Sequence, residues 1–126
     1  MDFLKKDSMK YKLGIVGTRN PGIHYEELET LITSIIKLEE VSEIISGGAK
    51  GIDSYGKNLA IKNQVPFKEY IPEYGKYGRK ATLIRNRQIV ENSDKIIAFP
   101  SQGSTGTYHT VSIARELNKP VIIQNI

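Results

Sequence analysis

The stretch YKLGIVGTRNPG, residues 11–22, decides the fold. It begins with a short apolar run over residues 11–16 and then changes at Gly17 into a turn of glycine, proline and polar residues. A short apolar run that ends in such a turn is typical of a buried strand. After the turn, apolar residues recur at helical spacing between charged ones, which predicts an amphipathic helix over residues 24–39.

The same succession of strand, glycine turn and helix occurs a second time. A strand is predicted over residues 41–46, and the turn GGAKG at residues 47–51 separates it from a helical stripe over residues 52–60. Alternating strands and helices predict a Rossmann-like α/β fold, in which helices cover both faces of a parallel five-stranded sheet of strand order 3-2-1-4-5. The remaining strands are expected at residues 66–71, 94–99 and 120–124, and the remaining helices at residues 79–92 and 105–118.

Length and composition fit one ordinary globular domain. The chain has 126 residues, and we expect residues 1–10 to be a flexible lead-in and residues 11–126 to form a single nucleotide-binding domain. The absence of cysteine excludes thiol nucleophiles, iron–sulfur clusters and disulfides, and it fits a cytoplasmic protein. No apolar run approaches the roughly 18 residues of a membrane span, so no membrane partner is expected.

The formal net charge of +4 suits an anionic ligand. Several of the cations are clustered rather than spread evenly, and such a cluster is either a solvated face or part of a phosphate site. The glycine-rich turns nearby favour the phosphate site. The clustered cations are Lys76, Arg79, Lys80, Arg85 and Arg87.

Three glycine-rich turns follow the first, second and fourth predicted strands, and therefore lie at one edge of the sheet, where its strand order reverses. Glycine lets the backbone approach an anion closely, and the free N–H groups that begin the next helix stabilise phosphate. The residues predicted to line this phosphate site are Gly17, Thr18, Arg19, Ser46, Gly47, Gly48, Pro100, Gly103, Ser104, Thr105, Gly106 and Thr107.

Side chains near these turns extend the predicted site. Asp53 either accepts hydrogen bonds from ribose hydroxyls or satisfies N–H groups at the start of its own helix. Arg85 is expected to face the ligand, with Asn86 beside it and Arg79 earlier in the same helix, whereas Arg87 is two residues away and points elsewhere.

Two further features leave alternatives open. The tyrosines of residues 70–77 either fold over the site and stack on a base or serve as surface anchors. His109 either hydrogen-bonds a phosphate or is an ordinary helix-surface residue. Because His24 and His109 are the only histidines and are far apart in the sequence, no metal site and no cofactor are expected.

Familiar catalytic motifs are missing. No Gly-Lys-Ser/Thr follows a turn at Walker spacing, and no G-x-G-x-x-G follows the first strand, which disfavours ATP hydrolysis and hydride transfer. Ser104, Thr105 and Thr107 are interpreted as helix caps and phosphate donors rather than nucleophiles, because no Ser-His-Asp arrangement is apparent.

Taken together, the motifs resemble the SLOG superfamily, the Rossmann-like group that includes the Smf/DprA DNA-processing domain and the Lonely Guy phosphoribohydrolases. The order and spacing are most similar to small stand-alone members of that group. The matching stretches span nearly the whole chain and lie at residues 14–19, 46–53, 78–81, 84–86, 93–100 and 103–107.

The resemblance implies several functions. Lonely Guy enzymes use an arginine before the fourth strand and a glutamate after the Gly-Thr pair; Arg85 matches the first, but Thr110 occupies the second position. We therefore expect a sensor or sequestering protein for a nucleotide or nucleotide-derived ligand, and not an enzyme. One alternative is N-glycosidic hydrolysis of a nucleoside 5′-monophosphate, with Arg85 catalytic and Asp53 or Glu116 replacing the glutamate. The other is single-stranded DNA binding as in DprA-like proteins, and relatives in the superfamily also imply a homodimer or higher homo-oligomer.

Overall fold

The computed structural model describes residues 10–126, and its centre is a parallel five-stranded sheet of order β3-β2-β1-β4-β5. This confirms the predicted fold class and strand order. The first nine residues of the expected lead-in, residues 1–10, lie outside the described part of the chain. The strands are β1 (Tyr11–Gly17), β2 (Val41–Gly47), β3 (Phe67–Tyr70), β4 (Lys95–Phe99) and β5 (Val121–Ile123).

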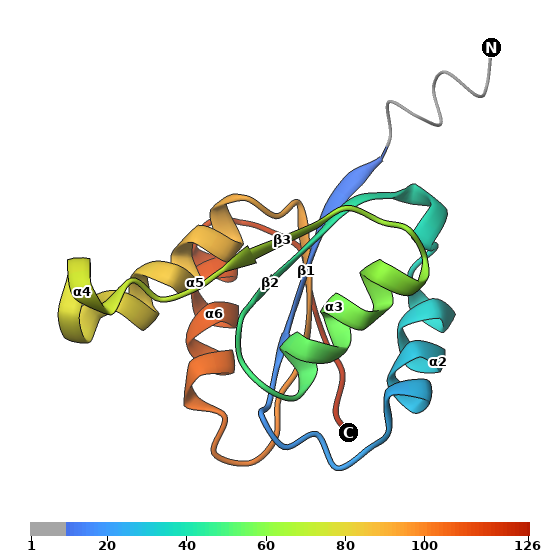
Figure 1. Cartoon of the computed structure of the whole chain (residues 1–126), viewed down its shortest axis with the longest axis horizontal. Coiled ribbons are helices and arrows are strands. Elements are labelled where there is room, and N and C mark those ends of the chain that lie inside the picture. The colour runs from blue at the N-terminus through green and yellow to red at the C-terminus, as the bar shows by residue number, and fades with distance from the viewer. Residues whose placement is uncertain (1–9) are drawn as a thin grey trace.

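Two pairs of helices cover the sheet, one pair on each face (Figure 1). On one face lie α2 (Tyr25–Ile35) and α3 (Ile52–Lys62), and on the other lie α5 (Ala81–Glu91) and α6 (Thr105–Glu116). Three shorter elements complete the described chain: the 3₁₀ turns η1 (Leu38–Glu40) and η2 (Gly78–Lys80) and the single-turn helix α4 (Tyr74–Tyr77).

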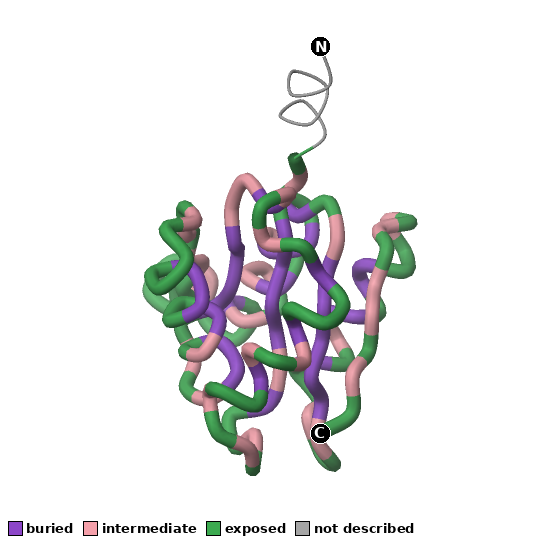
Figure 2. Tube along the Cα trace, turned by 90° about the vertical axis from the view of Figure 1, so that its right-hand side faces the viewer, coloured by how far each residue is buried: buried purple, intermediate pink, exposed green. Residues whose placement is uncertain are grey.

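The apolar runs of β1 and β4 are continuous because both faces of these strands are buried. Successive side chains of a strand point to opposite faces. Ile97 and Phe99 therefore pack under α2 and α3, whereas Ile96 and Ala98 pack under α5 and α6. All four are 0% exposed. Figure 2 shows the buried residues concentrated along the strands in the middle of the molecule.

The first helix ends earlier than predicted. It begins after His24, whose backbone N–H donates to the Glu27 carboxylate at 3.2 Å, and it stops at Ile35 rather than at residue 39. Ile36 adopts an extended conformation and is buried in the core, so packing overrides the helical spacing of the sequence. The predicted helix of residues 79–92 likewise divides into η2 and α5. No helix among residues 10–126 has the length and apolar character needed to cross a membrane.

Candidate functional site

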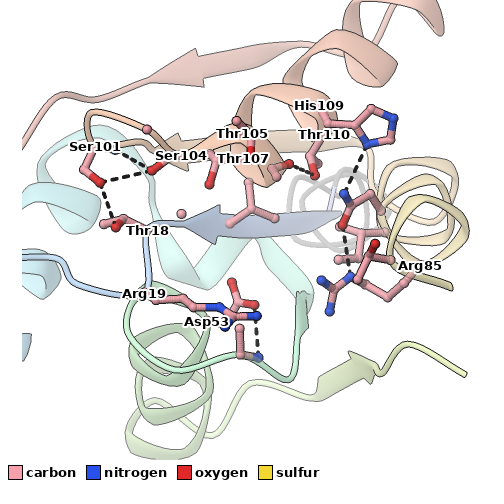
Figure 3. Close-up of a pocket in the computed structure, with 18 of the residues that line it drawn as sticks. Thr18, Arg19, Asp53, Arg85, Ser101, Ser104, Thr105, Thr107, His109 and Thr110 are labelled. Atoms are coloured by element: carbon pink, nitrogen blue, oxygen red, sulfur yellow. Dashed lines mark hydrogen bonds between the residues drawn. The ribbon is translucent and has the colours of Figure 1, made fainter. Parts of the chain in front are cut away.

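A pocket of about 670 Å³ lies at the carboxyl ends of β1 and β4, where the strand order reverses (Figure 3). Parallel sheets with this topology bind ligands at that edge. Side chains from the turn after β1, from the start of α3, from α5 and from the start of α6 surround the pocket. The predicted site residues that line it are Gly17, Thr18, Arg19, Asp53, Arg85, Asn86, Gly103, Ser104, Thr105, Gly106 and Thr107.

Thr18 connects the segments that form the pocket wall. Its N–H donates to the carbonyl of Phe99 at 3.0 Å, and its carbonyl accepts the N–H of Ile52 at 3.1 Å. Its hydroxyl accepts a hydrogen bond of 2.8 Å from the Ser101 hydroxyl. Because one residue bonds to the end of β4, to the turn after β4 and to the start of α3, these segments hold one another in place.

The N-terminus of α6 faces the pocket. Ser104 occupies the N-cap position, but its hydroxyl accepts the N–H of Ser101 at 2.9 Å and makes no capping hydrogen bond to the helix. Gly106 and Thr107, in the first turn, line the pocket. Uncapped N–H groups and the positive end of the helix dipole favour an anion at this position.

Asp53 and Arg85 lie side by side above Gly47. A Cβ atom on Gly47 would come within 2.6 Å of Arg85 Nη1 and 2.7 Å of Asp53 Oδ2, so a larger residue there would require both side chains to shift. Burial raises the pKa of Asp53 to about 6, although the Ala49 N–H, 3.3 Å from Oδ2, and the charge of Arg85 favour the carboxylate. Burial also lowers the pKa of Arg85, while the Asp53 carboxylate opposes that change.

A chain of hydrogen bonds fixes the orientation of Arg85. Its Nε donates to Asn86 Oδ1 at 3.0 Å, and its Nη1 donates to the carbonyl of Tyr70 at 3.4 Å. Asn86 is buried, and its Nδ2 lies 3.1 Å from Nδ1 of His109. With Asn86 Oδ1 already accepting from Arg85, its amide nitrogen faces His109, whose Nδ1 must then be the acceptor. His109 lines the pocket, and its hydrogen bond to a phosphate stays a prediction.

Five of the predicted residues do not line the pocket. Ser46 is fully buried and donates to the Ile15 carbonyl at 2.6 Å, and Gly47 lies beneath Asp53 and Arg85. Gly48 is exposed and lies beside Ile71, away from the pocket lining. The other two are Arg79, which is exposed in η2, and Pro100, which is buried after β4.

The pocket also contains residues that were not predicted. Thr110 occupies the position at which a Lonely Guy enzyme has its glutamate; it is buried, and its hydroxyl donates to the Gly106 carbonyl at 3.1 Å. Glu116, one candidate replacement, is exposed and lies 3.8 Å from Arg87, outside the pocket. Asp53 is therefore the one carboxylate among the described residues that line the site. Other unpredicted lining residues are Val16, Asn20, Ala49, Thr82, Leu83, Ile89, Ser101 and Gln102.

The tyrosines of residues 70–77 do not close over the pocket. Tyr70, Tyr74 and Tyr77 are absent from its lining, and α4 projects sideways from the body of the molecule (Figure 1).

Within residues 10–126, no group of three or more His, Cys, Asp and Glu side chains is placed to hold a metal ion.

Comparison with known proteins gives a family and a structural relative. No curated protein matches the chain. The X-ray structure of DNA processing protein A (DprA) from Streptococcus pneumoniae matches with a TM-score of 0.70 and 22% sequence identity, and the match covers 95% of this chain. This chain spans 52% of the DprA chain, about half its length. A sequence model of the DNA recombination-mediator protein A family matches residues 4–67, just over half of the chain. The chain therefore belongs to the DNA recombination-mediator protein A family, and it has the Rossmann-like SLOG-type fold of DprA.

Proposed function

We propose that this chain binds single-stranded DNA and holds one nucleotide of the strand in the pocket between β1 and β4. The observation that carries the proposal is the convergence of Arg19, Arg85 and the N-terminus of α6 on one pocket. These are the groups that bind phosphate, and they occur here in a member of a family named for DNA recombination. In this arrangement the phosphate lies at Gly106 and Thr107, and the sugar lies toward Asp53.

Free nucleotides, and nucleotide-derived signals, form the second candidate ligand class. The pocket volume of about 670 Å³ falls within the range of about 300–1,000 Å³ that is usual for small-molecule sites. A free nucleotide would use the same phosphate and sugar positions as a nucleotide within a strand. The two proposals therefore differ in what lies outside the pocket, and oligonucleotide length separates them.

Fluorescence anisotropy with labelled oligothymidylates of increasing length, in competition with unlabelled thymidine monophosphate, tests the proposal. We expect affinity to rise with strand length, and we expect the logarithm of affinity to fall linearly with the logarithm of salt concentration, because each neutralised phosphate releases counterions. Equal affinity for the monophosphate and a long strand, with little salt dependence, would instead identify a free-nucleotide binder. If neither ligand binds at millimolar concentration, both candidates are wrong.

Arg85→Ala is expected to weaken binding of single-stranded DNA by about 10- to 100-fold, because a hydrogen bond to a charged group contributes about 1.5–3 kcal/mol. The matched control is Arg87→Ala on the same helix. Arg87 lies 3.3 Å from Glu91 and 3.8 Å from Glu116, and it does not line the pocket, so its loss should leave affinity unchanged. Equal effects of the two substitutions would show that Arg85 contributes only general positive charge.

His109→Ala is expected to weaken binding by about 3- to 10-fold, because losing one neutral hydrogen bond costs about 0.5–1.5 kcal/mol. His109 acts here through Asn86, whose amide it holds in the orientation that accepts from Arg85. His109→Gln, which retains a side-chain acceptor, should recover part of the affinity. In an Arg85→Ala background, His109→Ala should have no further effect. Additive losses would show that His109 contacts the ligand independently of Arg85.

A further inference from the structure

The segment of residues 71–80, between β3 and α5, forms an arm beside the sheet (Figure 1). It contains α4 and η2, and it includes large apolar side chains that face solvent. Ile71 is 59% exposed and Tyr74 is 60% exposed. Exposed aromatic rings on a projecting segment are available for contact with another molecule.

The arm continues directly from the wall of the pocket. Arg85 lines the pocket and donates to the carbonyl of Tyr70 at 3.4 Å. Tyr70 is the last residue before the arm. Burial lowers the pKa of Arg85, and Tyr74 lies near enough to oppose part of that change, after Asp53. Leu83, in the first turn of α5 and three residues after the arm ends, lines the pocket and is 49% exposed.

The charge of the arm is complementary to a phosphate backbone. Lys76, Arg79 and Lys80 are exposed, and Glu73 is the one acidic residue of the segment. In the part of the chain that the structure describes, none of these three cations forms an ion pair. This differs from Arg87, whose charge is already paired within α5 and with α6.

We propose that the arm is a second contact surface for single-stranded DNA, on which a base next to the pocket nucleotide stacks against Tyr74 while Arg79 and Lys80 neutralise the adjoining phosphates. The proposal rests on the proposed function and extends the same site outward. Aromatic rings interleaved with cations are the usual surface for single strands, because every base presents a face for stacking and every linkage carries a charge. An apolar protein partner would leave the three cations of this segment without counter-charges.

The test compares Tyr74→Ala with wild type for two ligands, a 12-residue oligothymidylate and thymidine monophosphate. Stacking contributes about 1–3 kcal/mol per base, so Tyr74→Ala should weaken oligonucleotide binding by about 5- to 150-fold and leave monophosphate binding unchanged. Tyr108→Ala is the matched control: Tyr108 is 50% exposed on α6 and lies outside both the arm and the pocket lining. Arg79→Ala should reduce the slope of log affinity against log salt by about 0.7.

Each outcome has a defined meaning. Unchanged oligonucleotide affinity in Tyr74→Ala overturns the arm while leaving the pocket proposal intact. An equal loss for both ligands also overturns it, since that result indicates damage to the pocket. A change of oligomeric state by light scattering, without a change in DNA affinity, assigns the arm to contact between copies of the chain. If wild type itself fails to bind the oligonucleotide, the proposed function fails and the arm fails with it.

Discussion

Asp53→Asn is expected to stabilise the folded chain by up to about 3 kcal/mol above pH 6, the largest gain in stability that a single substitution in the site should give. Asp53 is 8% exposed, and its pKa is raised by burial from 3.8 to about 6. One pKa unit corresponds to about 1.4 kcal/mol, so keeping the carboxylate charged in the folded state costs about 3 kcal/mol. Asparagine has nearly the same shape and can still accept from the Ala49 N–H.

The pH dependence follows from the direction of this change. Because the folded state holds the Asp53 proton more tightly than the unfolded chain does, the folded state is favoured below pH 4. This contribution is lost as pH rises from about 4 through about 6 and stays lost at higher pH. The Ala49 N–H, the charge of Arg85 and the Ser46 hydroxyl offset part of the cost of burial, and the pKa of about 6 is the net result. The substitution should therefore have little effect at pH 4 and its full effect at pH 8.

Urea denaturation of wild type, Asp53→Asn and Glu73→Gln at pH 4, 6 and 8 measures this difference. Glu73 is an exposed carboxylate on the arm, so its substitution controls for the loss of one negative charge. Equal stabilities of wild type and Asp53→Asn at pH 8 would show that the buried carboxylate carries no such cost. The Asp53→Asn variant also reports on ligand contact. Loss of the charge beside Arg85 should strengthen DNA binding, whereas a role in accepting ribose hydroxyls predicts weaker binding of ribonucleotides.

The sheet could be predicted because each strand is marked by its own short apolar run and by the turn that follows it in the sequence. Residues 96–99 are apolar on both faces of their strand, and glycine turns mark the ends of β1 and β2, so element type and strand order followed from the sequence. The ends of the helices were predicted less accurately than the existence of the elements. Ile36 continues the helical spacing of α2 in the sequence. In the structure its backbone is extended and its side chain is buried in the core, and the local sequence does not indicate this conformation because it depends on packing.

Residues that line the pocket were predicted where they follow from the position of a glycine-rich turn. They were missed where the direction of a side chain depends on neighbours distant in sequence. Thr18 and Gly106 follow from turn position alone. Ser46 belongs to the same type of turn, yet it points inward to the Ile15 carbonyl. The sequence left the role of His109 open, because its contact with Asn86, 3.1 Å away on another helix, joins residues 23 positions apart that no sequence spacing connects.

Gly51→Ala is expected to destabilise the fold by about 3 kcal/mol or more and to displace Arg19 from the pocket. Gly51 precedes α3 with φ of 77° and ψ of −125°, a conformation that residues with a side chain rarely adopt. An added Cβ would also collide with the backbone carbonyls of Thr18 and Arg19. Backbone strain and overpacking each cost about 1–3 kcal/mol, and here both occur at once.

Gly22→Ala separates the two contributions. Gly22 also has a positive φ, of 69°, but a Cβ there would have open space around it, so only the backbone conformation is penalised, by about 1–2 kcal/mol. Thermal unfolding of both variants gives the difference due to collision, and their affinities for oligothymidylate show whether the turn has moved. A Cβ at residue 51 would collide with the Thr18 carbonyl, and the Thr18 hydroxyl accepts a hydrogen bond from Ser101 in the turn after β4. Gly51→Ala should therefore weaken binding even where the chain remains folded. Equal stability and equal affinity of the two variants would show that the turns of the pocket adjust independently.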